Sequence, residues 1–240
     1  MVHLERLALA AVLLTFAFGG YFWIGLSVDP AEAASLATPL DAHIPFVPAM
    51  LPVYAVVYLM ILLPIFLVES PALFRRIVVA YLVMVAICLL CFALFPVSGA
   101  ALRPDLATVE THPFLLWGLR LNYALDPPVN LFPSLHLAGA TLASLAVGKA
   151  RASYGRIAGI LVVPIALSVC AVKQHYWIDA AAGIALGFGV YAVLLARWSP
   201  PAGETLARPP RAWLGFAGLL ATVYLALYLA YRAGFEPFPG

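Results

Sequence analysis

Three short segments of the chain contain the polar side chains best suited to chemistry. In chain order these segments supply Arg103, then Ser134 and His136, then Lys173, His175 and Asp179. His175 and Asp179 are four residues apart, which would place them on one face of a helix. The carboxylate could then hold one imidazole nitrogen and leave the other free and more basic. This pattern is typical of a histidine that acts as a nucleophile or a general base.

The segment around His136 is predicted to begin a helix. Pro133 suits the first helical position, where its missing N–H needs no partner, so Ser134 and His136 should lie in the first turn. Free N–H groups and the positive end of the helix dipole make such a terminus favourable for an anion. Arg103 and Lys173 add positive charge nearby. Cations, an in-line nucleophile and a proton donor together are what phosphoryl transfer requires.

The composition places these residues in a membrane protein. Of 240 residues, 65% are hydrophobic and 10% are charged, whereas soluble domains are about half apolar and about a quarter charged. The three cysteines lie in apolar runs, which argues against a disulfide-stapled secreted module. The net charge of +2, without any run of Lys or Arg, argues against nucleic-acid binding.

The hydrophobic runs predict an all-α integral membrane protein with a single transmembrane domain over residues 1–240. A spanning helix needs about 20 apolar residues, and the first run is longer than the apolar core of a signal peptide, so we expect it to be retained. Glycines 183, 187 and 189 are expected to let the sixth span approach a neighbour closely. The seven expected spans are Leu7–Ser27, Met50–Val68, Ile77–Pro96, Ser134–Gly148, Ile157–Lys173, His175–Arg197 and Ala212–Tyr231.

The basic residues predict the orientation of these spans. Four of them fall in one set of loops: Arg103, Arg120, Lys173 and Arg232. The other nine fall in the opposite set: Arg6, Arg75, Arg76, Lys149, Arg151, Arg156, Arg197, Arg208 and Arg211. By the positive-inside rule the N-terminus is cytoplasmic and the 98–133 connection is extracytoplasmic. The three polar segments then share the extracytoplasmic side, and we expect Arg103, Ser134, His136 and His175 to face one cavity.

The motifs also resemble those of a known family. Pro133-Ser134-Leu135-His136, followed by His175-x-x-x-Asp179, resembles the second and third signatures of the type 2 phosphatidic acid phosphatase superfamily. The stretches 126–132 and 173–176 look closest to its branch related to inositolphosphorylceramide synthases. The resemblance covers residues 95–197. It implies a six-helix phosphatase-type core, to which residues 212–231 would add a C-terminal transmembrane helix, and a metal-independent reaction in two steps without a cofactor.

The resemblance also implies a role for each matching residue. His175 would attack phosphorus to form a phosphohistidine, Asp179 would hold His175, and His136 would protonate the leaving alcohol. Ser134 and Arg103 would bind phosphate oxygens. Water or a second alcohol would then accept the phosphoryl group.

The chain departs from the family pattern at three places. Pro96 stands where the first signature has a lysine, Leu135 where the second has a glycine, and Val169 where the third has an arginine. Two phosphate-binding cations are therefore missing. Lys173 is the first candidate to replace one of them, and Arg120 is a weaker candidate for the other.

Several functions remain open at this point. The expected substrate is a lipid phosphate, drawn from the surrounding membrane lipids, and it could be hydrolysed or could donate its headgroup to another lipid. A transporter would instead need ionisable residues spread through the bilayer depth, and the middles of several spans are apolar. A metal site built from His136, His175 and Asp179 has suitable ligand types but no evident fourth ligand. A purely structural subunit would not cluster such polar residues.

Overall fold

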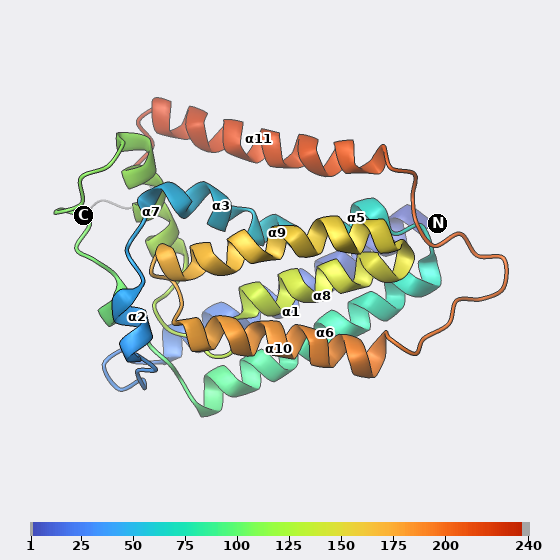
Figure 1. Ribbon diagram of the computed structural model, residues 1–240, viewed down its shortest axis with the longest axis horizontal. Helices are drawn as coiled ribbons and strands as arrows, with labels where there is room; N and C mark the ends of the chain where they lie inside the picture. Colours follow the sequence, from blue (N-terminus) through green and yellow to red (C-terminus); the bar gives the residue numbers. More distant parts are fainter. Residues whose placement is uncertain (1, 237–240) are drawn as a thin grey trace.

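The structure of the protein is a computed structural model, which describes residues 2–236. The described residues form an all-helical bundle, drawn in Figure 1 with its longest axis horizontal. The eleven α-helices of this part are α1 (Val2–Ser27), α2 (Pro39–His43), α3 (Leu51–Ala55), α4 (Val57–Met60), α5 (Leu63–Leu67), α6 (Pro71–Leu94), α7 (Pro113–Leu125), α8 (Leu135–Ala150), α9 (Ala152–Ala171), α10 (Trp177–Leu194) and α11 (Ala212–Arg232). Short 3-10 turns cover Pro48–Met50 and Ala100–Leu102. Helices α1, α6, α9, α10 and α11 are long and apolar enough to cross a bilayer, as expected of a multi-pass membrane protein.

The short helix α8 lies inside the bundle and packs against α9 and α10 (Figure 1). Its many Ala, Gly, Ser and Thr side chains let the neighbouring backbones approach closely. A Cβ atom at Gly183 of α10 would overlap the backbone oxygen of Ser134, and one at Gly187 would lie 2.8 Å from the backbone oxygen of Ala138. The close approach predicted for these two glycines is confirmed. Gly189 has open space beside it and plays no such part.

The observed helices differ from the predicted spans at their ends, and two of these differences have a clear local cause. The expected span Met50–Val68 is divided into α3, α4 and α5, and the break before α5 lies next to Pro64. Proline has no N–H to bond the preceding turn, and its ring crowds the carbonyl four residues earlier. Helix α6 begins earlier than expected because Ser70 caps it, its Oγ accepting a hydrogen bond from the backbone N–H of Leu73 at 2.9 Å.

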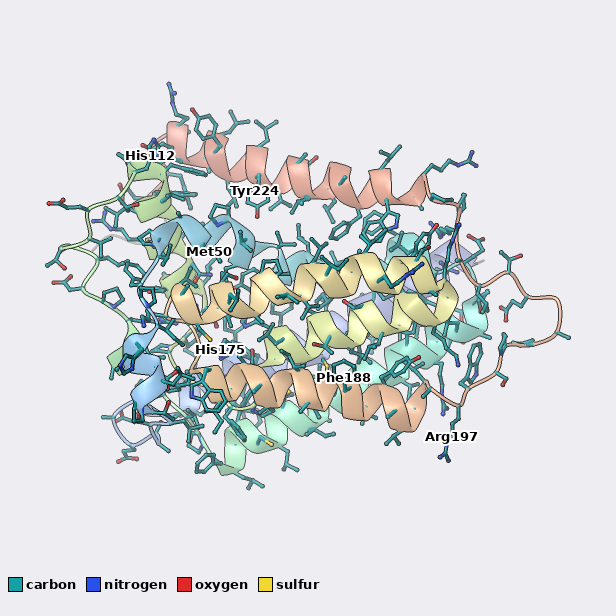
Figure 2. The ribbon with its side chains drawn as sticks, viewed as in Figure 1. Met50, His112, His175, Phe188, Arg197 and Tyr224 are labelled. Atoms are coloured by element: carbon teal, nitrogen blue, oxygen red, sulfur yellow. The ribbon has the colours of Figure 1, made fainter. Side chains whose placement is uncertain are left out.

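The two ends of the bundle carry different charged groups. At the end that holds the N-terminus, Arg75 pairs with Glu5 at 2.6 Å and Arg208 pairs with Glu69 at 3.2 Å. Arg197 lies at this end and His175 at the opposite one (Figure 2). The end that holds His175 also contains α2 and α7 (Figure 1). All three predicted polar segments therefore lie at one end of the bundle.

Helix α7 lies within the 98–133 connection and has 13 residues. His112 caps it, because its Nδ1 accepts a hydrogen bond from the backbone N–H of Phe114 at 3.2 Å. Trp117, Leu119 and Asn122 on this helix are buried. Helix α7 thereby brings polar side chains to the same end as His175.

Candidate active site

Ser134 and His136 stand at the start of α8. Ser134 is the N-cap: its Oγ accepts from the backbone N–H of Leu137 at 3.4 Å, and its own N–H donates to the backbone oxygen of Asp179 at 3.1 Å. Pro133 lies just before this cap, not at the first helical position as predicted, because the helix begins at Leu135. His136 lies in the first turn, as expected.

His175 and Asp179 meet, although not on one helical face. Helix α10 begins at Trp177, so His175 precedes it, and Asp179 caps its first turn by accepting from the N–H of Tyr176 at 3.0 Å. The Nδ1 atom of His175 lies 3.6 Å from Oδ2 of Asp179. This distance is longer than a hydrogen bond, but catalytic contacts of this kind often tighten only when substrate binds.

The second nitrogen of His175 is the centre of the cluster. Its Nε2 lies 3.1 Å from Oγ of Ser134 and 3.3 Å from Nδ1 of His136. Ser134 and His175 are 0% and 5% exposed, so water has little access to these contacts. The structure therefore brings together the two histidines, the serine and the aspartate that the sequence singled out.

Arg103 lies beside this cluster and is held by three acceptors. Its guanidinium donates to the backbone oxygens of Tyr123 at 3.0 Å and Asp126 at 2.6 Å, and to Oε1 of Gln174 at 2.8 Å. It also stacks over the ring of Tyr123. Burial raises the pKa of Tyr123 to about 12, with the Arg103 guanidinium opposing part of the rise. Arg103 is thus fixed next to the residue that precedes His175.

The other two cations lie away from the cluster. Nζ of Lys173 donates to the backbone oxygen of Ile44 at 2.6 Å and lies 3.5 Å from that of Asp41, so it secures the loop around α2. Arg120 is exposed on α7 and borders a separate hollow beside Trp117. The expectation that these two residues replace the missing family cations gains no geometric support.

A buried carboxylate that the sequence reading did not single out lies on the far side of His136. Oδ2 of Asp126 is 4.0 Å from Nε2 of His136. The same carboxylate accepts hydrogen bonds from three tyrosine hydroxyls: Tyr21, Tyr54 at 3.1 Å and Tyr58 at 3.4 Å. His136 therefore stands between His175 on one side and a negatively charged group on the other.

A chain of hydrogen bonds continues from this carboxylate to Arg103. The side-chain Nδ2 of Asn122 donates to the hydroxyl of Tyr58 at 3.0 Å. The side-chain Nε2 of Gln174 donates to Oδ1 of Asn122. Gln174 in turn accepts from Arg103. All of these polar groups are satisfied by one another, as buried polar groups need to be.

The expectation of one shared cavity is only partly met. A cavity of about 550 Å³ is lined by His136 and Asp126, whereas Arg103, Ser134 and His175 are not among the described residues that line it. His175 instead contacts His136 directly, and Ser134 contacts His175. A phosphoryl group bound here would replace the hydrogen bonds that now join the two histidines and the serine.

Comparison with known proteins places this geometry in a family. Residues 27–193 match the model of the PAP2 superfamily, and this stretch includes Ser134, His136, His175 and Asp179. The same comparisons matched no curated protein and no solved structure. The predicted resemblance is confirmed at the level of the superfamily, while its finer branch stays a prediction. With its helical membrane fold and its paired histidine motifs, this chain belongs to the PAP2 superfamily and has a phosphatase-type function.

Proposed function

We propose that the protein cleaves a lipid phosphoester through a phosphohistidine on His175. The observation that carries this proposal is the environment of the two ring nitrogens of that residue. Nδ1 faces the carboxylate of Asp179 at 3.6 Å, while Nε2 is held among Ser134 and His136. An imidazole that donates from Nδ1 to a carboxylate keeps a lone pair on Nε2 for attack.

In the first step Nε2 of His175 attacks phosphorus and the bond to the lipid oxygen breaks. A protonated His136 donates a proton to that oxygen, so a neutral alcohol leaves. In its charged form His136 has two N–H groups, one facing His175 and one facing Asp126. In the second step neutral His136 takes a proton from water, which attacks phosphorus, breaks the P–N bond and regenerates His175.

The phosphate oxygens are proposed to be held at the start of α8. Ser134 offers its hydroxyl, and the helix adds free backbone N–H groups and the positive end of its dipole. Arg103 supplies positive charge from the neighbouring loop. Lys173 and Arg120 are left out of this proposal because their side chains lie elsewhere.

Hydrolysis and headgroup transfer share this first step. Transfer between lipids is the alternative that the likeness of residues 126–132 to the inositolphosphorylceramide-synthase branch favours. The two differ only in whether water or a lipid alcohol attacks the phosphohistidine.

We also propose that the catalytic end faces the extracytoplasmic side. Nine of the 13 basic residues fall in the loops assigned to the opposite end, and positive loops are retained in the cytoplasm. The substrate would then be a lipid of the outer leaflet. Cysteine accessibility of introduced residues on the 98–133 connection and on the 198–211 loop, measured in intact cells, tests this orientation.

The proposed function is tested with purified protein and a lipid phosphate labelled with radioactive phosphorus. We expect phosphate release in vesicles, and after rapid quenching a protein-bound label that acid removes and alkali does not, as is typical of phosphohistidine. Adding a lipid alcohol acceptor distinguishes transfer from hydrolysis. Chelation by EDTA is expected to leave the rate unchanged. Absence of any labelled protein, or a rate lost to EDTA and restored by zinc, would contradict the mechanism.

The negative charge of the Asp126 carboxylate should favour the protonated form of His136, which gives a testable prediction. Asp126→Asn retains the shape of the side chain but removes the charge that favours the imidazolium. His136 would then lose its proton at a lower pH, so the alkaline limb of the profile of kcat/KM should move to lower pH. At neutral pH the rate should fall by about tenfold to a hundredfold. An unchanged alkaline limb would show that Asp126 is only structural.

A further inference from the structure

The cavity beside His136 is elongated and apolar. On α1 its wall runs from Ala10 to Phe22, a length of about 18 Å at 1.5 Å per residue. On α6 it runs from Phe74 to Val85. Its volume of about 550 Å³ is in the range of ligand sites in proteins. Beside His136 the wall carries the carboxylate of Asp126 and the hydroxyls of Tyr21 and Tyr58 that bind it.

The position of His136 on this wall decides which part of a substrate the cavity can receive. His136 protonates the leaving oxygen in the proposed mechanism, so the group attached to that oxygen lies beside His136. Ser134 and His175, which hold and attack the phosphoryl group, are not among the described residues that line the cavity. The cavity is therefore placed to receive the leaving group and not the phosphoryl group.

Part of the wall comes from helices outside the family match. Helix α1 up to residue 26 and all of α11 lie outside residues 27–193. Tyr224 lines the cavity from α11, and its hydroxyl donates to the backbone oxygen of Pro52 in α3 (Figure 2). Tyr21 of α1 lines it too and binds Asp126. Two helices that lie outside the matched stretch thus contribute to the wall of this cavity.

We propose that this cavity holds the hydrocarbon chain of the lipid alcohol released in the first step. The chain would begin beside His136 and run along α1 toward Ala10. This inference rests on the proposed function. What it adds is the place of the hydrocarbon chain and the assignment of α1 as the element that limits the length of that chain.

The cavity would select substrates by whether their hydrocarbon chain fits, and not by how hydrophobic that chain is. A hydrocarbon chain in the bilayer is already in an apolar medium, so moving it into the protein gains little from the hydrophobic effect. A chain that meets an obstruction, however, cannot bring its oxygen to His136. Bulk introduced into the cavity should therefore penalise long chains and spare short ones.

The positions on α1 provide graded obstructions. Counted from Tyr21, which binds Asp126, Ala17 lies about 6 Å and Ala10 about 16 Å further along the helix. Ala17→Phe should lower kcat/KM for hexadecyl phosphate by at least about tenfold and leave butyl phosphate unchanged. Ala10→Phe should have a smaller effect, confined to the longest chains. Val12→Phe is the matched control, because Val12 is 59% exposed on the same helix and does not line the cavity.

The first step must be followed separately from turnover. Slower labelling of His175 by the long-chain substrate in Ala17→Phe is expected. Normal labelling with slower transfer to an added lipid alcohol would overturn the proposal, because the cavity would then hold the acceptor. An unchanged chain-length profile would also overturn it, because ordinary bilayer lipid would then fill the space. Failure of the proposed function is distinct from both, since the unaltered protein would then release no phosphate from either substrate.

Discussion

His175→Ala is expected to lower phosphate release from a lipid phosphate by roughly a thousandfold or more. The variant lacks the nitrogen that attacks phosphorus, and neither Ser134 nor His136 can replace it in line with the leaving oxygen. The protein-bound label should disappear with the activity. Initial rates in vesicles and the quenched labelling experiment measure the two effects.

His43→Ala is the matched control for this variant. His43 is exposed in α2 at the same end of the bundle, and its ring contacts only the backbone oxygen of Pro39 at 2.7 Å among the described residues. Both variants should elute at the same position in size-exclusion chromatography and melt at similar temperatures. If His175→Ala is as active as the unaltered protein, His175 is not the nucleophile.

The loss of activity in His136→Ala should depend on the leaving group of the substrate. This dependence distinguishes a residue that donates a proton from one that attacks phosphorus. With an alkyl phosphate the leaving alkoxide is strongly basic and needs a proton, so the rate should fall by about 10²- to 10⁴-fold. With p-nitrophenyl phosphate the leaving phenolate is weakly basic, and the first step should lose much less. The measurement is the amplitude and rate of p-nitrophenolate release in the first turnover.

The pH profile provides an independent check on the same assignment. In the unaltered protein the rate should rise with pH as His175 loses its proton and should fall as His136 loses its own. The plot of rate against pH is therefore expected to be bell-shaped. The groups around His136 include Asp126, Tyr54 and Tyr58. In His136→Ala the fall at high pH should vanish with the alkyl substrate. If His136→Ala loses the same fraction of the rate with both substrates and keeps the bell-shaped pH profile, another residue is the proton donor.

The candidate site was largely predictable because charged residues are costly in a membrane and are rarely found there without a function. A charged side chain at the centre of a spanning helix costs about 2.5 to 3.5 kcal/mol. His136, His175 and Asp179 therefore stood out in apolar surroundings. The structure brings them together as expected, although Asp179 reaches His175 as a helix cap and not along one helical face.

The partners of Asp126 were not predictable in the same way. Tyr21, Tyr54 and Tyr58 lie in apolar runs, where a tyrosine is ordinarily found as an anchor at the membrane surface. Nothing in local spacing indicates that three separate hydroxyls bind one carboxylate, because that depends on how α1, α3 and α4 pack. The available signal was Asp126 itself, a lone acidic residue close to the His136 motif.

The misplaced cations have a similar cause. Lys173 was chosen for its nearness in sequence to His175, but a lysine has a long and flexible side chain that can reach several acceptors. In the structure it satisfies carbonyl oxygens of the preceding loop. The break before α5 in the second span, in contrast, follows from Pro64, and the sequence contained that information.

The contact between Gly183 and Ser134 has a mechanical consequence for this enzyme. With the backbone hydrogen bond from Ser134 to Asp179 it joins the start of α8 to the start of α10, so Ser134 and the proposed nucleophile His175 should keep their positions relative to each other. Asp126, by contrast, is tied to α1 through Tyr21. A thinner or thicker bilayer that tilts α1 should therefore disturb the proposed proton donor His136 more than His175.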